Sequence, residues 1–117
     1  MNTGYITINE ESVFVFPFNG EIWMTARQIA VLFGVFHSAV ASNIRSIYKN
    51  GILCETKTYK MYSTEKTMTE FYNLRMIIAL AYRLSGRKAE LFREWVYKTI
   101  TFPEMLTNIG LNQAMLN

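Results

Sequence analysis

Residues 25–48, TARQIAVLFGVFHSAVASNIRSIY, carry the pattern that decides the fold. Thr25 stands where a helix N-cap belongs, and Gln28 follows three residues later as a capping-box partner. The apolar positions behind this cap repeat at helical spacing: Ile29, Leu32 and Phe33. Gly34 supplies the positive φ with which many helices end. The pattern therefore predicts a short helix that stops at Gly34.

A second helix is expected directly after this glycine. Ser38 is the candidate N-cap, and Asn50-Gly51 is the signal that ends the helix. Between them, three apolar residues recur one turn apart and form a stripe that faces the core: Val40, Ile44 and Ile47. The stretch is thus predicted to form two helices joined by a tight turn, with the polar side of the second helix offered to a partner.

A helix-turn-helix requires a small residue where the helices cross, a glycine in the turn, an apolar plug after it, and buried apolar residues one turn apart in the second helix. The positions that meet these requirements are Ala30, Gly34, Val35, Val40 and Ile44. In such a unit the second helix, here about residues 37–49, lies in the major groove of DNA and its N-terminal residues meet base edges. The sequence therefore predicts a protein that binds double-stranded DNA.

The side chains expected to contact DNA lie on or beside the second helix. They are Arg27, Phe36, His37, Ser38, Ala41, Ser42, Arg45, Lys49, Lys57 and Lys60. Arg45 can reach a guanine edge or a phosphate, and Ala41 can touch a thymine methyl group. Arg27 and Lys49 are placed for phosphates, which supply most of the non-specific affinity. Only Arg45 is a full charge on the reading face, so a two-helix unit that packs without binding DNA remains the alternative.

The rest of the chain predicts short strands and two further helices around this unit. The predicted strands cover residues 5–8, 12–18, 21–24, 57–62 and 67–72. The predicted helices cover residues 74–84, capped by Asn73, and 87–102. Pro17 marks the end or edge of a strand, and Asn19-Gly20 is a strong hairpin-turn signal that returns the chain into residues 21–24. The second hairpin carries Lys57, Lys60 and Lys66.

Together these elements predict an α+β, winged-helix-like helix-turn-helix with an N-terminal β-hairpin, a second β-hairpin and two to three C-terminal helices. We expect residues 1–102 to form a single DNA-binding domain. Residues 103–117 are expected to form a helical tail, which is apolar enough to pack on the domain or on a second subunit. A homodimer is the expected assembly, because it would match a palindromic site.

Composition and charge indicate which kinds of partner and cell compartment fit the chain. The formal net charge is +3, with 12 Lys+Arg against 9 acidic residues, all of them Glu. Residues 25–60 hold five basic residues against one Glu, and residues 75–98 hold six against two, which fits a polyanionic partner. The one cysteine, Cys54, allows no internal disulfide and is expected to be half-buried. No secretory signal or membrane span is evident, so we expect a cytoplasmic protein.

An enzyme is not expected. The chain has no Asp, one His, no Glu pair at metal-ligand spacing and no visible nucleophile–base pair. The sequence indicates no cofactor, no metal and no small-molecule substrate. The main alternative to DNA binding is a protein–protein interaction module that retains the helix-turn-helix fold. For Arg93 and Trp95 the expected role is structural, whereas Arg83, Arg87 and Lys88 are either phosphate contacts or part of a solvated turn.

Longer motifs add a family resemblance. Residues 34–40, GVFHSAV, resemble the turn and recognition helix of phage Cro-type repressors. The chain further resembles the N-terminal part of RhuM-type virulence proteins, and its latter half is similar to the Bro-N and KilA-N modules of phage and viral DNA-binding proteins. The motifs that carry this resemblance are Trp23-Met24-Thr25, Leu32-Phe33-Gly34, Tyr72-Asn73-Leu74, Ile77-Ile78, Ala81-Tyr82-Arg83-Leu84 and Phe92-Arg93-Glu94-Trp95.

The resemblance spans about residues 12–102 and implies DNA binding, mobile-element ancestry and a bacterial cytosol. It implies no particular DNA target. Two features depart from the family. Residues 63–66 lack the glycine expected between the strands of the second hairpin. The long C-terminal extension of the family's full-length members has no counterpart in this sequence, so the family does not inform residues 103–117.

Overall fold

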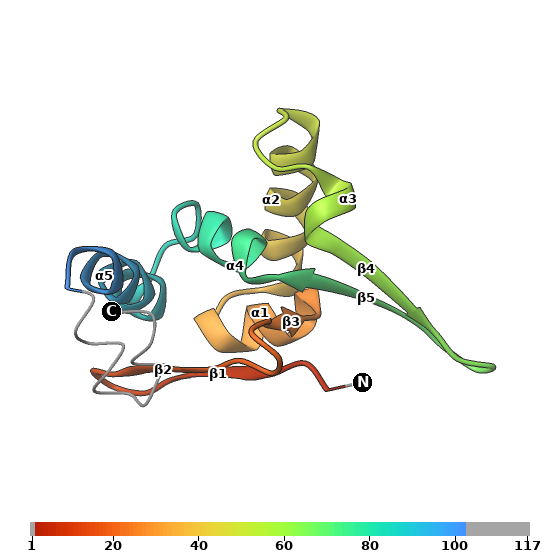
Figure 1. Cartoon of the computed structure of the whole chain (residues 1–117). Coiled ribbons are helices and arrows are strands. Elements are labelled where there is room, and N and C mark those ends of the chain that lie inside the picture. Colours follow the sequence, from red (N-terminus) through yellow and green to blue (C-terminus); the bar gives the residue numbers. More distant parts are fainter. Residues whose placement is uncertain (1, 103–117) are drawn as a thin grey trace.

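The computed structural model describes residues 2–102 as a mixed α+β arrangement, which confirms the predicted class (Figure 1). The elements in chain order are β1 (Tyr5–Ile8), β2 (Val13–Phe16), β3 (Trp23–Met24), α1 (Ala26–Phe33), α2 (His37–Lys49), α3 (Glu55–Thr58), β4 (Tyr59–Ser63), β5 (Met68–Asn73), α4 (Leu74–Ala81) and α5 (Arg87–Thr101). The expected helical tail, residues 103–117, lies outside the described residues.

The N-terminal ribbon consists of β1 and β2, which pair antiparallel from Tyr5↔Phe16 to Ile8↔Val13. Alternation along the strands turns Ile6 toward the core. β2 ends before Pro17, as predicted, since proline has no N–H for strand pairing.

The Asn19-Gly20 turn is also confirmed. The backbones of Phe18 and Glu21 exchange hydrogen bonds of 2.9 and 3.0 Å around it. Both turn residues adopt positive φ, 51° for Asn19 and 76° for Gly20. The chain returns after this turn as predicted, with Glu21 pairing back to Phe18, but β3 then hydrogen-bonds β5 of the other sheet.

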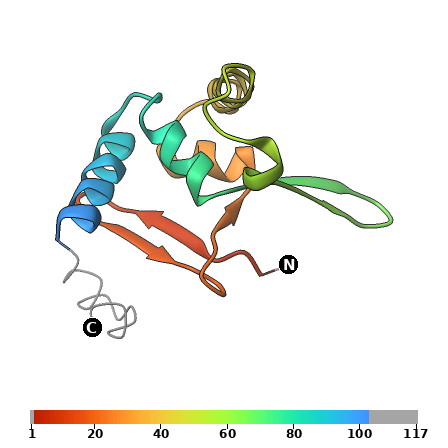
Figure 2. The same ribbon diagram turned by 45° about the horizontal axis from the view of Figure 1, so that its top comes forward.

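The second sheet has the strand order β3-β5-β4, and its β4–β5 hairpin projects from the body of the molecule (Figure 2). The hairpin register runs from Tyr59↔Tyr72 to Ser63↔Met68. The predicted strand 57–62 begins too early, because Lys57 and Thr58 belong to α3. Thr58 is buried there, and its hydroxyl donates to the carbonyl of Cys54 at 2.9 Å.

The two-helix unit closely follows its sequence signals. Thr25 and Gln28 form the predicted capping box, and Gly34 ends α1 at φ 66°. The chain direction changes by 117° between α1 and α2. The apolar stripe of α2 is buried, as predicted: Val40, Ile44 and Ile47. Ser38 is not the N-cap of α2. Phe36 occupies that position, because its carbonyl already accepts from the amides of the first turn.

The C-terminal helices pack around Phe92, whose ring meets the Phe33 ring edge-on with centroids 5.6 Å apart. Asn73 caps α4 as predicted, with its side chain accepting from the Met76 amide. α4 stops at Ala81 rather than residue 84. The Arg93 guanidinium secures this end by donating to the carbonyl of Ala81 at 2.6 Å and to that of Leu84 at 3.2 Å. Arg93 is therefore structural, as expected.

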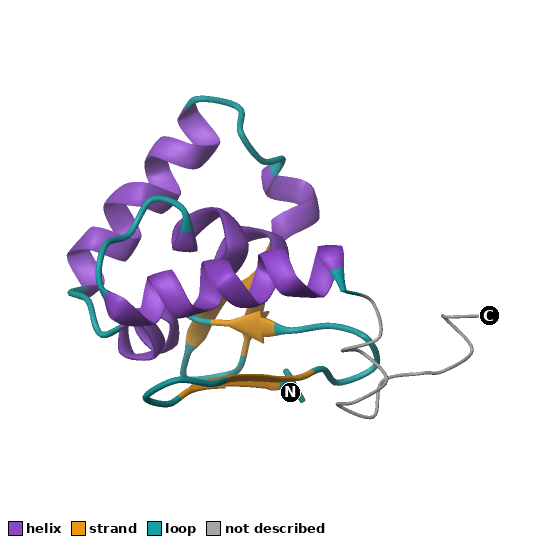
Figure 3. Cartoon of the chain, turned by 90° about the vertical axis from the view of Figure 1, so that its left-hand side faces the viewer, coloured by secondary structure: helices purple, strands orange, loops and turns teal. Residues whose placement is uncertain are grey.

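The helices stack over one face of the N-terminal ribbon (Figure 3). α1 lies between α2 and the ribbon, so the ribbon and α2 occupy opposite ends of the molecule (Figure 1). Within residues 2–102, no single helix has the length and apolar character needed to cross a membrane; only the sharply bent pair α1 and α2 reaches that composition when taken together.

Candidate nucleic-acid interface

The outward side of α2 is a continuous polar stripe. The exposed residues that compose it are Ser38, Ser42, Arg45 and Lys49. Their spacing of four, three and four residues keeps them on one side of a helix with 3.6 residues per turn. The buried stripe on the opposite side fixes this orientation, because rotating α2 would expose three apolar side chains. Ala41 lies half-buried beside the polar stripe.

A groove at the N-terminal end of α2 joins the two-helix unit to the projecting hairpin. It has a volume of about 580 Å³. α1 contributes Arg27, α2 contributes His37, and the hairpin contributes Met61, Met68 and Glu70. The hairpin residues of this groove were not predicted as site residues. Strand alternation could have grouped Met61 with Glu70, but it could not have placed either residue opposite α2.

Phe36 is the most exposed large apolar side chain at this end of α2, with 83% of its surface accessible. It stands at the helix N-cap and makes no side-chain capping bond. The first turn of α2 therefore has no side chain that satisfies its free backbone N–H groups. Such groups can donate to a phosphate oxygen.

Two predicted DNA contacts lie away from this groove. Lys60 is on the hairpin face opposite Met61, and its Nζ sits 5.3 Å from the centre of the Trp23 ring. A cation over an aromatic face is attracted electrostatically, so the Lys60 ammonium group interacts with the Trp23 ring. Lys57 is exposed on α3 instead of on the hairpin. The expectation that the second hairpin carries Lys57 together with Lys60 and Lys66 is therefore wrong for Lys57.

Arg83 ties the end of α4 to α2. Its guanidinium donates to the Asn43 side-chain oxygen at 2.9 Å and to the Ser46 hydroxyl at 2.7 Å. Asn43 also donates to the carbonyl of Ala39 within α2. These contacts attach α2 to the end of α4 through residues that neighbour the exposed polar stripe. Neither Asn43 nor Ser46 was predicted as part of the site, because their partner lies far away in the sequence.

Tyr72 is a buried residue of β5 that lines the groove. Burial disfavours the phenolate and, with the nearby Glu70 carboxylate, raises the pKa of Tyr72 to about 12. A raised pKa in the folded state means that the contribution to stability is complete below the unfolded value of about 10 and is lost as the pH rises toward 12.

We expect a Tyr72→Phe variant to lose less stability than the wild type between pH 9 and pH 12, because phenylalanine has no proton to release. The measurement is urea unfolding at pH 9, about 10.5 and about 11.5 in both proteins. Tyr97→Phe, at an exposed tyrosine of α5, is the control and should follow the wild type. Parallel pH curves for wild type and Tyr72→Phe would contradict the prediction.

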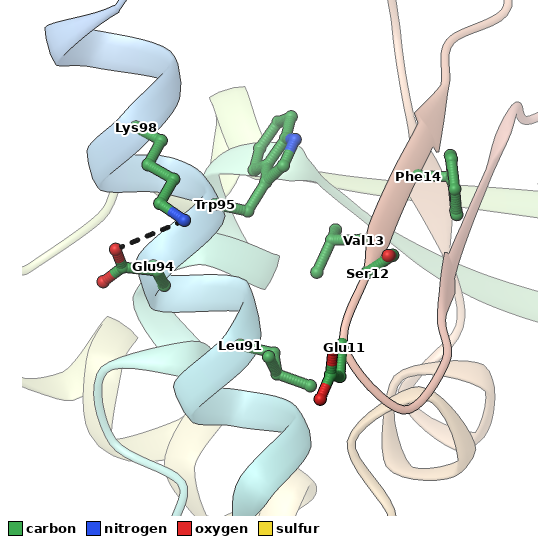
Figure 4. Close-up of a pocket in the computed structure, with 8 residues that line it drawn as sticks. All are labelled: Glu11, Ser12, Val13, Phe14, Leu91, Glu94, Trp95 and Lys98. Atoms are coloured by element: carbon green, nitrogen blue, oxygen red, sulfur yellow. Dashed lines mark ion pairs between the residues drawn. The ribbon is translucent and has the colours of Figure 1, made fainter.

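A second groove, of about 280 Å³, lies between α5 and the start of β2 (Figure 4). Trp95 and Leu91 face Val13 across it, and Glu94 pairs with Lys98 at 3.7 Å on its rim. These groups form a packing seam whose rim carries an i,i+4 ion pair. Within residues 2–102, no three His, Cys or Glu side chains lie close enough together to hold a metal ion.

Cys54 is exposed, contrary to its predicted half-burial. Its hydrogen bond with the Thr56 hydroxyl lowers the pKa of the thiol.

Comparison of the chain with protein-family models, with curated proteins and with solved structures gives no match.

Proposed function

We propose that this protein binds duplex DNA through a helix-turn-helix formed by α1 and α2, with α2 as the recognition helix. The exposed stripe of α2 carries the proposal, because it offers two hydroxyls and two cations along one side of a well-anchored helix. Helices of this kind enter the major groove and read base edges with side chains of these types.

The geometry of the two helices supports this proposal. A change of direction of 117° lies within the roughly 90–120° typical of the motif. Ala30 is buried on α1, and Val35, half-buried, follows the glycine turn. The β4–β5 hairpin then corresponds to a wing, so a winged-helix-like arrangement is part of the same proposal. We also propose that the chain belongs to the RhuM-type family, which is related to Bro-N and KilA-N modules. A cytoplasmic location is part of the same proposal.

The charges indicate how binding energy would be divided. Arg45 and Lys49 lie on the stripe, and Arg27 lies on the groove beside it. Few cations near α2 imply few phosphate contacts, so one copy should bind modestly and with a moderate salt dependence. Base contacts would come from Arg45, Ser42 and Ser38. Lys57 and Lys60 would add phosphate contacts only where the DNA reaches α3 or the outer face of the hairpin.

The test is binding of fluorescent random-sequence duplex DNA across a salt series, in wild type and in Arg45→Ala. We expect log K to fall linearly with log salt, with a slope of about −3 for three to four phosphate contacts. Arg45→Ala should weaken binding by roughly tenfold, the cost of one charge-assisted contact. The control is Lys98→Ala, which removes one charge from α5, away from α2, and should have little effect.

Binding that does not respond to salt would contradict the proposal. Equal losses in Arg45→Ala and Lys98→Ala would also contradict it, because they would indicate attraction by net charge without a role for α2. Circular dichroism of each variant must match that of wild type, so that a loss of binding is not a loss of fold.

The second candidate is a protein-interaction module, and exposed apolar side chains favour it. Val31 of α1 and Met68 of the hairpin have 72% and 68% of their surface accessible, and Phe36 at the start of α2 has 83%. The partner surface would then centre on Phe36 and the hairpin. In that case Phe36→Ser would abolish partner binding while DNA binding stayed absent at low salt. Salt-dependent binding of DNA that Arg45→Ala weakens would argue against this candidate.

A further inference from the structure

The outer side of the N-terminal ribbon carries four aromatic side chains that the proposed DNA contact does not use. They are Tyr5, Phe14, Phe16 and Phe18, here called the aromatic face. Each of these residues has 43–56% of its surface accessible. The pairing Tyr5↔Phe16 and Thr7↔Phe14 puts the strand residues on one side, opposite the core-facing Ile6. The rings stack on one another, with centroids 4.7 Å apart for Tyr5 and Phe16 and 6.3 Å apart for Phe14 and Phe16.

Charge argues against a nucleic acid on this face. Platforms that stack bases combine aromatic rings with a basic groove. Residues 1–24 contain three Glu and no Lys or Arg, and the strand residues of the face are uncharged. A neutral face also meets its own copy without placing like charges in direct contact. The occupant that fits this chemistry is therefore apolar protein surface.

The aromatic face has a hollow at one end and an exposed ring at the other. At the Tyr5 end, a hollow of about 380 Å³ is bounded by Tyr5, Phe16, Phe18 and residues 2–4. Phe14 lies toward the other end of β2, with 43% of its surface accessible and its ring stacked against Phe16. Two ribbons laid face to face and antiparallel would bring the Phe14 ring of each copy over the hollow of the other. The same contact would occur twice, as an isologous interface requires.

From these observations we propose that two copies of the chain associate through the aromatic face, with Phe14 of each copy seated in the hollow of its partner. An aromatic side chain buries roughly 150–250 Å² in total, so four that are about half exposed offer on the order of 400 Å². A standard interface takes about 800 Å² per partner. The association is therefore weak and concentration-dependent.

The arrangement has a consequence for the DNA contact, and this consequence alone rests on the proposed function. The ribbon and α2 lie at opposite ends of the molecule (Figures 1 and 3). A dimer through the aromatic face therefore holds its two α2 helices at its far ends, not side by side. Such a dimer contacts two separated DNA segments instead of adjacent half-sites of one palindrome.

The association is tested without DNA, so its failure is separate from failure of the proposed function. Sedimentation velocity of the full chain from about 10 μM upward should show a reversible monomer–dimer equilibrium with a dissociation constant in the micromolar range. Phe14→Thr and Phe16→Thr should each raise the dissociation constant at least about tenfold, because threonine keeps strand propensity and removes the ring. Ile52→Thr, at an exposed apolar residue after α2, is the matched control and should leave it unchanged.

A second measurement locates the interface even if a threonine variant unfolds. In a Cys54→Ser background, spin labels at Thr7→Cys on the aromatic face and at Ser42→Cys on α2 report distances between the copies. The Thr7 distance should be short and the Ser42 distance long. A wild type that remains monomeric throughout, threonine variants that associate like wild type, or a Ser42 distance shorter than the Thr7 distance would each overturn the proposal.

Discussion

Replacing Phe92 by alanine is expected to lower the free energy of unfolding by about 3–5 kcal/mol, the range for deleting a buried aromatic side chain. Phe92 is completely inaccessible to solvent. Its ring meets Phe33 edge-on and lies 5.5 Å from the Trp95 ring, so it joins α5 to α1. Truncation leaves a cavity at this junction, and neither helix can close it without losing other buried contacts.

The measurement is urea and thermal unfolding of Phe92→Ala against wild type. A loss of this size should lower the Tm by at least about 10 °C in a domain of this length. Ile100→Ala is the control, because it removes an aliphatic side chain from the same helix at a position 72% exposed. It should change stability by no more than about 0.5 kcal/mol. Similar losses in the two variants would mean that α5 does not anchor the core through Phe92.

The local features of the fold could be predicted from the sequence because their causes lie within a few residues. The Thr25 capping box, the Gly34 stop and the buried stripe of α2 all depend on contacts within one or two helical turns. The exposed stripe with Arg45 follows from the same period. The proposed reading residues of α2 were thus identifiable as a group before their surroundings were known.

Features that depend on distant residues could not be predicted in this way. β3 leaves the ribbon because Trp23 and Met24 pair with β5, about fifty residues later. The attachment of Arg83 to Asn43, and of Lys60 to Trp23, likewise joins segments far apart in the chain. α3 was missed because a single helical turn is too short to show periodicity. The contacts of Arg83 and Lys60 occupy two cations that could otherwise bind a phosphate. The basic residues around α2 were therefore the part of the candidate site that the sequence predicted least well.

Among the glycines of residues 2–102, Gly4, immediately before β1, has the tightest surroundings. Its φ is +67°, in the left-handed region that favours glycine. A Cβ built there would lie 2.7 Å from the Phe16 carbonyl oxygen and 2.9 Å from that of Glu21. Both obstacles are backbone atoms, and the backbone of the preceding residue is held by a hydrogen bond from the Trp23 amide to the Thr3 carbonyl. The ribbon and the Asn19-Gly20 turn therefore close around the glycine.

We expect Gly4→Ala to destabilise the fold by about 2–5 kcal/mol, since it adds steric overlap of roughly 1–3 kcal/mol to the left-handed backbone cost of roughly 1–2 kcal/mol. Gly20→Ala separates the two causes, because Gly20 has φ +76° and nothing within 4 Å of the added Cβ. It should cost only the backbone part. Chemical unfolding of both variants measures the difference. If Gly4→Ala were no more destabilising than Gly20→Ala, the chain before β1 would yield to the methyl group, and the ribbon could not be the closed unit that positions the aromatic face.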